Sequence, residues 1–517
     1  MNPNNFRYQL IIFVTICLLT LISQALAEPY PGYTLFSPNN GRNTYLANLN
    51  NTIVHSWTHT RSGGYSAYLL EDGHVLRPSN INNSVFNGGG ATGGVQNADW
   101  NGTLVWDYTY SNSQHHSHHD IEPMPNGNVL LIAWELKTAA EARQAGYNRN
   151  VSIWPDHIVE VQPVGSTGGT IVWAWHAWNH LIQDYDATKD NYGVVGDHPE
   201  LLDINMSGGG GPSGGDWMHT NGISYNPQLD QIVISSHTLN EVYVIDHSTT
   251  TEEAAGHTGG NSGMGGDILY RWGCPSNYDA PGSAYFHVVH CSVWIPEGLS
   301  GAGHIMAFNN REGMGTSIVA EIVPPSDSLG HYHIGQDSAF GPSAPIWTYT
   351  ASGFYSNHLG GCQRLPNGNT LIAEATSGYL FEVNSSGVVQ WSYARGGEIS
   401  RALRYGLDYP GLAPLAVSDD VEILPNQMEL SQNYPNPCNS STTIQFHLLK
   451  DCEIKLVIHN ILGKRIRVLE SGTLAAGDHQ TIWDSKDDLG EPVCSGIYFG
   501  VLKAGSGEKS IKIVLIK

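Results

Sequence analysis

The sequence predicts an all-β fold, and three of its features lead to this prediction. Glycine accounts for 59 of the 517 residues and charged residues for only 14%, which indicates many tight turns and little exposed helix. Aromatic and β-branched residues fill short runs separated by Asn-Gly, Asp-Gly and Gly-Gly pairs, a pattern typical of β-hairpins. The sequence also lacks the long Glu- and Lys-rich stretches that are typical of surface helices.

The chain begins with the pattern of a secretory signal peptide over residues 1–27. Arg7 supplies positive charge, residues 10–21 are almost uninterruptedly apolar, and residues 25–27 form a small-x-small cleavage site. The apolar run is shorter than the roughly 20 residues that a membrane span needs. We therefore expect cleavage and export through the periplasm to a secreted or cell-surface location; an uncleaved anchor is the alternative.

Residues 28–412 repeat one phrase six times, and this repetition predicts the architecture. In each copy two or three apolar residues after a turn lead to a Trp, and a second phrase built on Pro-Asn-Gly or Asp-Gly alternates with it. Repeats of this size are typical of four-stranded propeller blades, so we expect a six-bladed β-propeller with long loops at residues 203–216 and 249–266. A β-sandwich with coincidental Trp spacing is the alternative. The six tryptophans are Trp57, Trp106, Trp173, Trp272, Trp347 and Trp391.

The end of the chain predicts a second domain. Residues 413–425 lack the repeated phrases and form the expected linker, and residues 426–517 contain about seven short strands, an immunoglobulin-like sandwich by count. Asn-Tyr-Pro-Asn-Pro at residues 433–437 and Ser-Gly-Ile-Tyr-Phe at residues 495–499 resemble the C-terminal sorting domain of proteins exported by the type IX secretion system. The resemblance implies the type IX machinery as a partner; a carbohydrate-binding or spacer module is the alternative.

Charge and cysteine content exclude several classes of function. The net charge of −23 disfavours nucleic acid as a partner. Six cysteines remain after the signal peptide, three in each part, which is an awkward count for a disulfide framework, and their pairing stays open. The sequence has no Cys-x-x-Cys pair, so we expect no structural zinc site and name no metal ligands.

Histidine is unusually abundant, with 24 residues against 24 Lys plus Arg. A propeller places its active site where loops converge over the central channel, so polar residues beside blade strands are the candidates. Four histidine-bearing segments meet this condition: residues 115–120, 216–222, 287–290 and 356–360.

Each segment has a chemical and a structural interpretation. The ionisable groups from His115 to Asp120 lower one another's affinity for protons and favour neutral imidazoles, although a solvated loop or adventitious metal binding is the alternative. His219 and Asn221 are two residues apart and face the same side of an extended strand, or belong to a turn that Asn caps. His290 leads a buried-looking strand, where a lone histidine is usually a satisfied core residue.

Three motifs resemble the signature segments of bacterial arylsulfotransferases. They are His-His-Asp-Ile at residues 118–121, Asp-Trp-x-His-x-Asn at residues 216–221, and His-Cys-Ser-Val-Trp-Ile-Pro-Glu-Gly at residues 290–298. The similarity runs from about residue 31 to residue 410. It implies a six-bladed propeller in which a central histidine is transiently sulfated. By motif alignment the catalytic residues would be His290, His119 or its neighbour His118, and His219, and the substrate-binding residues would be Asn221, His237 and His358.

One position departs from that family pattern. The family usually has an arginine after paired serines, whereas this chain reads Ser235-Ser236-His237. An imidazole carries charge only part of the time, unlike a guanidinium fork, so lower activity, an acid-shifted optimum or a different substrate would follow. Other arginines could substitute, namely Arg311, Arg364 or Arg404.

Together these features predict a nucleotide-independent enzyme that needs no cofactor. It would move a sulfuryl group from an aryl sulfate ester to a phenolic acceptor through a sulfohistidine. The sequence has neither the phosphate-cradling Gly-rich loop of nucleotide-dependent enzymes nor the carboxylate cluster or modified Cys/Ser motif of sulfatases. Two alternatives stay open: a non-catalytic surface propeller that binds protein or glycan, and a metal-dependent hydrolase or lyase that uses His115–His119.

Overall fold

The computed structural model describes residues 28–206, 215–335, 338–416, 428–448, 451–461, 464–504 and 507–517. It divides the chain into two compact units, Met1–Pro414 and Leu415–Lys517. The expected signal peptide and most of the expected linker lie outside the described residues. Within the described ranges, no helix is both long enough and apolar enough to cross a membrane.

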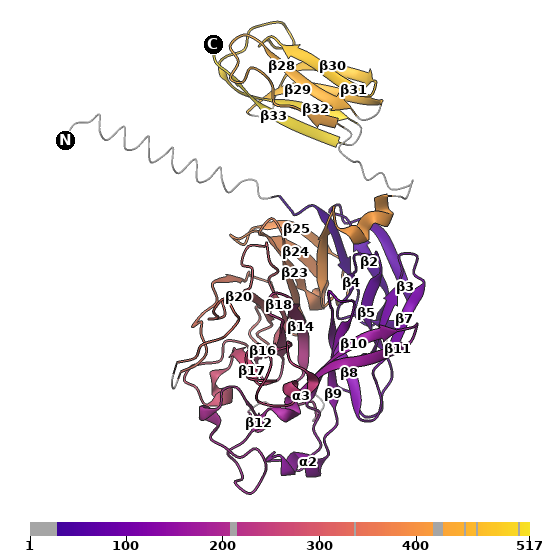
Figure 1. The fold of residues 1–517 in the computed structure, drawn as a ribbon. Helices are drawn as coiled ribbons and strands as arrows, with labels where there is room; N and C mark the ends of the chain where they lie inside the picture. The colour runs from indigo at the N-terminus through magenta and orange to yellow at the C-terminus, as the bar shows by residue number, and fades with distance from the viewer. Residues whose placement is uncertain are drawn as a thin grey trace, which may run out of the picture. The chain divides into compact units, whose positions relative to one another are not determined.

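The first unit is built almost entirely of antiparallel sheets, as the composition predicts (Figure 1). Its largest sheet contains eight strands in two groups of four, which a single residue pair, Gly63 with Ser79, joins. The last strand of the unit pairs with the first, so the two ends of the unit meet in one sheet. The strands are β26 (Ala402–Gly406), β1 (Gly32–Phe36), β2 (Gly41–Ala47) and β3 (Ile53–Gly63), followed by β4 (Tyr68–Leu69), β5 (Val75–Asn80), β6 (Gly93–Ala98) and β7 (Leu104–Thr109).

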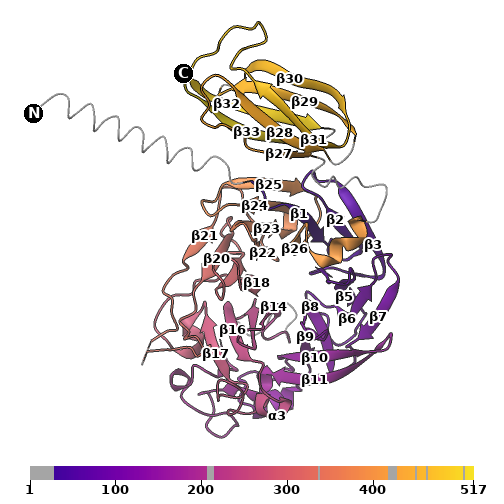
Figure 2. The same cartoon turned by 45° about the horizontal axis from the view of Figure 1, so that its top comes forward.

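Four further sheets of four strands each follow in chain order, and Figure 2 shows the sheets of this unit following one another around a ring. The second sheet is β8 (His115–Pro123), β9 (Val129–Glu135), β10 (Asp156–Val164) and β11 (Gly168–His176). The third is β14 (Thr220–Asn226), β15 (Gln231–Ser236), β16 (Glu241–Asp246) and β17 (Ile268–Trp272). The fourth is β18 (Val289–Trp294), β19 (Ile305–Asn309), β20 (Ile318–Ile322) and β21 (Trp347–Tyr349). The fifth is β22 (Gly361–Arg364), β23 (Thr370–Glu374), β24 (Tyr379–Val383) and β25 (Val389–Ala394).

The remaining described elements of this unit are short and lie in its connections. β12 and β13 form a parallel pair, and the two α-helices within the described residues each begin with a capping box, Thr138 with Glu141 and Thr250 with Glu253. Their bounds are α2 (Ala139–Gln144), α3 (Thr251–Ala254), β12 (Leu181–Ile182) and β13 (Leu202–Asp203), with 3₁₀ helices η1 (Ala177–Asn179), η2 (Val195–Asp197), η3 (Pro275–Tyr278), η4 (Ala375–Ser377) and η5 (Pro410–Ala416).

The six repeated tryptophans connect neighbouring groups of four strands. Each donates its indole N–H to an oxygen of the next strand group around the ring, and the sixth donates to the first group. Five of the six rings are buried, so each combines a packed ring with a satisfied donor. The donor–acceptor pairs are Trp57 to Asp99 O (3.1 Å), Trp106 to Gly168 O (2.8 Å), Trp173 to Thr249 Oγ1 (3.1 Å), Trp272 to Pro342 O (2.7 Å), Trp347 to Ser385 O (2.9 Å) and Trp391 to Leu49 O (2.9 Å).

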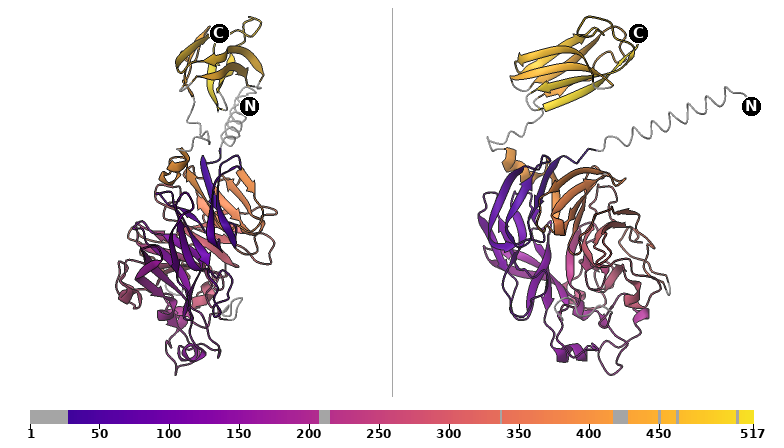
Figure 3. Two further views of the ribbon diagram at one scale, coloured as in Figure 1. Left: turned by 90° about the vertical axis from the view of Figure 1, so that its right-hand side faces the viewer. Right: turned by 180° about the vertical axis from the view of Figure 1, so that it is seen from behind.

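The second unit is an immunoglobulin-like sandwich, as the strand count predicts, and Figure 3 shows its strands in the yellow part of the colour scale. Its core lies between a three-stranded and a four-stranded sheet and includes Ile444, Leu456, Trp483 and Ile513. The first sheet is β27 (Met428–Leu430), β28 (Thr442–Leu448) and β31 (Gly477–Trp483). The second is β30 (Arg465–Leu474), β29 (Cys452–Asn460), β32 (Gly496–Ala504) and β33 (Gly507–Leu515).

Candidate active site

Four histidines from three different sheets form a continuous group, which we call the histidine cluster. His119 lies in β8, His219 precedes β14, His237 follows β15 and His290 lies in β18. The ring centroids of His119 and His219 are 4.6 Å apart, those of His219 and His237 are 4.8 Å apart, and those of His237 and His290 are 5.5 Å apart. The structure thus brings together three histidines that the sequence analysis selected from separate segments, with His237 between two of them.

Backbone bulges position these side chains. The pairing register shifts between Ser117 and Ile121 in β8, and between His290 and Val293 in β18. At the bulges His119 has φ 53° and Cys291, next to His290, also has φ 53°, a left-handed conformation that is uncommon for residues other than glycine. Bulges of this kind bend a strand and redirect a side chain, and they recur beside active sites.

The hydrogen bonds of His290 define which ring nitrogen carries a hydrogen. Asn310 donates its amide N–H groups to the carbonyls of Ser356 (2.8 Å) and Leu359 (2.5 Å), so its Oδ1 must face His290. Nδ1 of His290 lies 2.6 Å from that oxygen and therefore donates to it. Nε2 accepts a weaker bond from the Leu359 N–H at 3.3 Å. The lone pair of His290 is consequently on Nε2.

Two buried aspartates contact histidines of this region, Asp216 with His219 and Asp156 with His118. Asp216 Oδ2 lies 2.5 Å from His219 Nδ1, and its other oxygen accepts the Trp134 indole N–H at 2.9 Å. Asp156 Oδ1 lies 3.2 Å from His118 Nε2. His118 Nδ1 in turn lies 3.0 Å from His119 Nδ1. His118 therefore contacts the ring of His119, and Asp216 contacts the ring of His219.

The titration of these groups follows from their burial. Burial lowers the pKa of His118 and of His237 to about 3, and it lowers the pKa of His119 and of His290 well below the ordinary value. Burial, and then the charge of Asp216, raise the pKa of Asp156 well above its usual range. These four histidines are uncharged at neutral pH, which is the state that the sequence analysis predicts for the 115–120 segment.

Exposure shows where the cluster meets solvent. His119, His219 and His290 are 3%, 4% and 3% exposed. His237 and His358 are only half-buried. His358 hydrogen-bonds through Nε2 to Glu398 at 3.1 Å. A ligand that reaches the buried Nε2 of His290 would therefore approach from the side of His237 and His358.

A family model described as arylsulfotransferase (ASST) matches residues 57–405, and one described as FlgD Ig-like domain matches residues 438–508. The chain belongs to the arylsulfotransferase family. None of the curated proteins compared with it matches.

Solved structures similar to this arylsulfotransferase-family chain are distant. A Bacteroides caccae protein of unknown function is 11% identical and covers 72% of this chain and 98% of its own, with a TM-score of 0.39. Hydrazine synthase of Kuenenia stuttgartiensis is 14% identical, with coverages of 53% and 64% and a TM-score of 0.31. PorZ, a surface component of the type-IX secretion system of Porphyromonas gingivalis, is 12% identical, with coverages of 93% and 65% and a TM-score of 0.28.

The arginine that the arylsulfotransferase resemblance leads us to expect is replaced by His237, and the structure shows where the other arginines lie. Arg364 pairs with Glu321, Arg404 with Glu382 at 3.0 Å, and Arg311 donates to Thr316 at 3.0 Å. The sequence analysis did not nominate Arg401, which lies 2.7 Å from Asp120, the residue after His119. His237 itself keeps a buried Nδ1 without a hydrogen-bond partner among the described residues.

Asn221 joins neighbouring strands. Its amide donates to Val289 O at 2.7 Å, and its carbonyl accepts the Ser235 hydroxyl at 2.7 Å. These bonds tie β14 to β18 and leave one amide hydrogen for a ligand. Asn221 thus has a positioning role beside the substrate-binding role that the resemblance implies.

Two parts of the site were missed by the sequence analysis. The ring of Tyr65 lies 5.4 Å from that of His119, and burial raises the pKa of its phenol. Gly90 lies so close that a Cβ at this position would come within 2.0 Å of the His119 ring, and a Cβ at Gly89 would be 3.5 Å from His219. Three consecutive glycines were a visible signal of close backbone approach, but nothing in the sequence linked them to the histidines.

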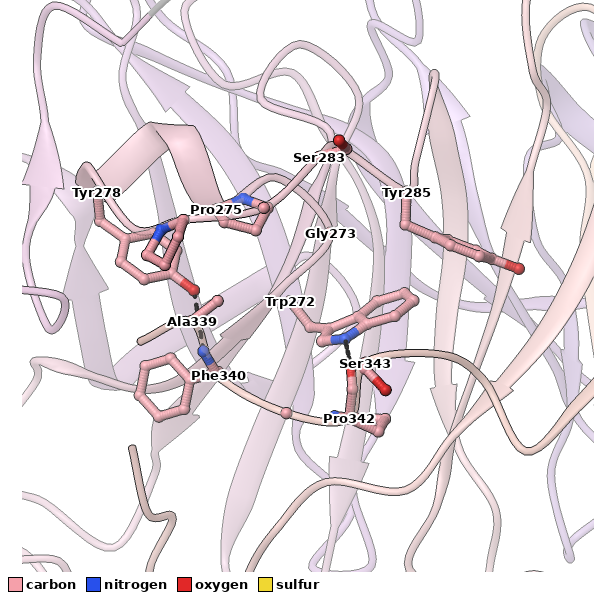
Figure 4. Close-up of a pocket in the computed structure, with 13 residues that line it drawn as sticks. Trp272, Gly273, Pro275, Tyr278, Ser283, Tyr285, Ala339, Phe340, Pro342 and Ser343 are labelled. Atoms are coloured by element: carbon pink, nitrogen blue, oxygen red, sulfur yellow. Dashed lines mark hydrogen bonds between the residues drawn. The ribbon is translucent and has the colours of Figure 1, made fainter. Parts of the chain in front are cut away.

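A separate cavity of about 340 Å³ lies beside η3 (Figure 4). Trp272 donates to Pro342 O at 2.7 Å, and Phe340 N–H donates to the Tyr278 hydroxyl at 3.1 Å, so two aromatic rings are fixed in its wall. Its lining residues include none of the histidine cluster. We therefore do not assign the reaction to this cavity.

Proposed function

We propose that this chain transfers a sulfuryl group from an aryl sulfate ester to a phenol, without a nucleotide, through a sulfohistidine at His290. The observation that carries the proposal is the fixed Nε2 lone pair of an uncharged imidazole. A neutral nitrogen nucleophile meets little repulsion from a sulfate monoester, and the N–S bond that it forms is labile. Membership of the arylsulfotransferase family supports this type of activity in general.

The first half-reaction uses the geometry around His290. Nε2 attacks the sulfur atom, the N–S bond forms, and the bond from sulfur to the phenolic oxygen breaks. We assign His219 to protonate the departing phenolate, because the Asp216 carboxylate, 2.5 Å from its Nδ1, orients the ring and leaves Nε2 available for proton transfer. His119, His237 and Asn221 are the proposed partners of the sulfuryl oxygens. In acyl-transfer enzymes one well-aimed donor is worth about 3–4 kcal/mol.

The second half-reaction reverses the same steps with a different phenol. The acceptor hydroxyl attacks the sulfur atom of the sulfohistidine and gives its proton to His219. The N–S bond breaks, and His290 regains its Nε2 lone pair. The two half-reactions share one site, so the donor product must leave before the acceptor binds.

The ring of tryptophan contacts supports six blades in the first unit. The two four-strand groups of the eight-stranded sheet and the four separate sheets make six groups, and the indole donors pass from each to the next and return to the first. We therefore propose a six-bladed β-propeller with the proposed domain bounds 28–412. The inner strands β8, β14, β18 and β22 would line its channel.

Export is a further part of the proposal. The residue patterns at 1–27 and 426–517 support cleavage of a signal peptide and recognition of the tail by the type IX machinery. An immunoglobulin-like fold of the second unit is compatible with this role. In a bacterium that has the type IX system, deletion of residues 426–517 should leave the protein in the periplasm; surface display of the truncated protein would refute the sorting role.

A colorimetric assay with 4-nitrophenyl sulfate and phenol tests the reaction. Release of 4-nitrophenol that requires phenol and survives EDTA is the expected result. Release without phenol that EDTA abolishes would identify a metal-dependent hydrolase instead. If folded protein releases no 4-nitrophenol, the non-catalytic binding propeller is the remaining interpretation.

A further inference from the structure

A second group of ligand-type side chains lies outside the histidine cluster. His180 follows η1, His257 belongs to the long connection from β16 to β17, and Asp267 immediately precedes β17. One ligand atom from each of the three lies within 4.8 Å of the others. His180 is fully buried and Asp267 is 5% exposed, whereas the His257 side chain is 60% exposed.

The contacts of this triad converge on one oxygen. His180 Nδ1 lies 2.8 Å from Asp267 Oδ1, and His257 Nδ1 lies 2.7 Å from the same atom. His180 Nε2 lies 2.9 Å from the carbonyl oxygen of Ala254. Because a carbonyl can only accept, Nε2 carries the hydrogen, and in a neutral ring the Nδ1 lone pair points at the carboxylate. Such an arrangement requires a cation between Nδ1 and Oδ1, either a proton or a metal ion.

We propose that His180, His257 and Asp267 bind a divalent metal ion of the zinc type. Two imidazole nitrogens and one carboxylate oxygen form a ligand set that zinc uses, with a fourth position for water. The bond from His180 Nε2–H to Ala254 O is the outer contact that metal-bound histidines almost always make, and it frees Nδ1 for the metal. Calcium and magnesium prefer oxygen ligands and fit this set less well.

Metal binding requires an adjustment of the ligand atoms, which lie within 4.8 Å of one another. Bonds of about 2.0–2.2 Å in tetrahedral geometry place ligand atoms roughly 3.3 Å apart, so the contacts to Oδ1 would lengthen by about half an ångström. His257 can make this change because its side chain is exposed and lies on a loop. The buried ring of His180, parallel to Trp175 at a centroid distance of 5.8 Å, would stay in place.

The ion would fasten the loop at residues 249–266 to the body of the unit. Within the loop, Gly266 N–H donates to Gly256 O at 3.0 Å and Gly265 N–H donates to Gly259 O at 3.0 Å. These bonds lie within the loop, whereas the triad joins the loop to His180. His180 and Asp267 are 87 residues apart in the chain. The role is structural and independent of the proposed sulfuryl transfer. No short metal motif exists in the sequence because the ligands are so far apart.

The direct test is metal content and metal-dependent stability of the full chain without a histidine tag. Protein treated with EDTA, dialysed and reloaded with Zn²⁺ should bind one ion that the variant His257→Ala does not bind. The matched control is His331→Ala, because the side chain of His331 is also partly exposed, at 40%, and pairs with a single carboxylate, Asp327, at 3.1 Å. Since only differences between variants count, zinc bound elsewhere, including at the histidine cluster, does not affect the result.

A second measurement uses unaltered protein. Zn²⁺ should raise the melting temperature, because binding to the folded state alone stabilises it, and should slow proteolysis within residues 249–266. The melting temperature of His257→Ala should not respond in this way. Equal zinc content in His257→Ala and the control, or an unaltered protein whose loop is cleaved at the same rate with and without Zn²⁺, would overturn the proposal.

Discussion

Among the histidines of the cluster, His290 and His219 are supported in opposite ways. His290 donates to a neutral amide, and burial lowers its pKa, whereas the ring of His219 contacts a buried carboxylate. This difference is what separates a nucleophile from a general acid in our mechanism. It depends on Asn310 and Asp216, neither of which was selected from the sequence as a site residue.

Asp216→Asn tests the support of His219. The amide N–H₂ would face Nδ1 and favour the wrong tautomer, so kcat should fall about 10²–10⁴-fold, as for the aspartate of a serine-protease triad. Steady-state kinetics with 4-nitrophenyl sulfate would measure this loss. Asp246→Asn is the matched control, because Asp246 is also buried but bonds to Ser248 in another part of the sheet. Equal kcat values for the two variants would contradict the assignment.

His237→Arg tests the departure from the family pattern. Because burial lowers the pKa of His237 to about 3, the imidazole contributes no positive charge near neutral pH. A guanidinium beside His290 should raise kcat/KM for an aryl sulfate by about 10-fold, equivalent to about 1.4 kcal/mol. An unchanged kcat/KM in a folded variant would mean that His237 does not contact the sulfuryl group.

At the scale of elements, hairpins were predictable and bulges were not. Gly127 and Gly368 have φ 84° in the Pro-Asn-Gly turns before β9 and β23, which is the local signal that the sequence analysis used. His119 and His219 adopt φ 53° and 52° without any local requirement for it. Packing of one sheet against the next imposes these angles, so the convergence of the site could be inferred only from family motifs.

Gly90→Ala tests the contact between the triple-glycine loop and the cluster. A Cβ there would strike the His119 ring, and we expect at least a 10-fold loss of kcat with a lower melting temperature. Gly102→Ala is the control because Gly102 has a similar φ, 82° against 79°, with nothing within 4 Å of the added atom. The same activity in both variants would show that backbone strain, and not the contact with His119, determines the effect.

For the whole molecule, the repeated tryptophans were the informative feature of the sequence. Their repetition led to the prediction of propeller blades, and the indole bonds between successive groups of four strands explain why the phrase is repeated. The triple-glycine loop and the metal-type triad could not be predicted in the same way, because both depend on residues that come together only after the sheets assemble.

The uncharged histidines should make the whole fold sensitive to acid. His118 and His237 have pKa values of about 3 when folded and near 6.5 when unfolded, so the unfolded state binds more protons between these values. Their stabilisation is present above pH 6.5 and is lost as the pH falls towards 3. The melting temperature should drop by several degrees between pH 7 and pH 4, and less in His237→Asn.

One residue acts in the opposite direction and serves as an internal control. Burial lowers the pKa of His247, but hydrogen bonds to Asp230 and Glu160 outweigh it and raise the value to about 9. The stabilisation from His247 is therefore complete below pH 6.5 and is lost as the pH rises through 9. Replacing His247 with Asn should lower the melting temperature at pH 7 and reduce its fall at alkaline pH. An unchanged pH profile in both variants would contradict these assignments.

Intact-mass measurement after incubation with 4-nitrophenyl sulfate alone tests the sulfohistidine most directly. Unaltered protein should gain the mass of one sulfuryl group, lose it on addition of phenol, and carry it on the peptide that contains His290. The variant His290→Asn should gain nothing. Transfer through His290 would be contradicted if the variant gained a sulfuryl group. It would also be contradicted if unaltered protein catalysed the transfer without ever gaining that mass.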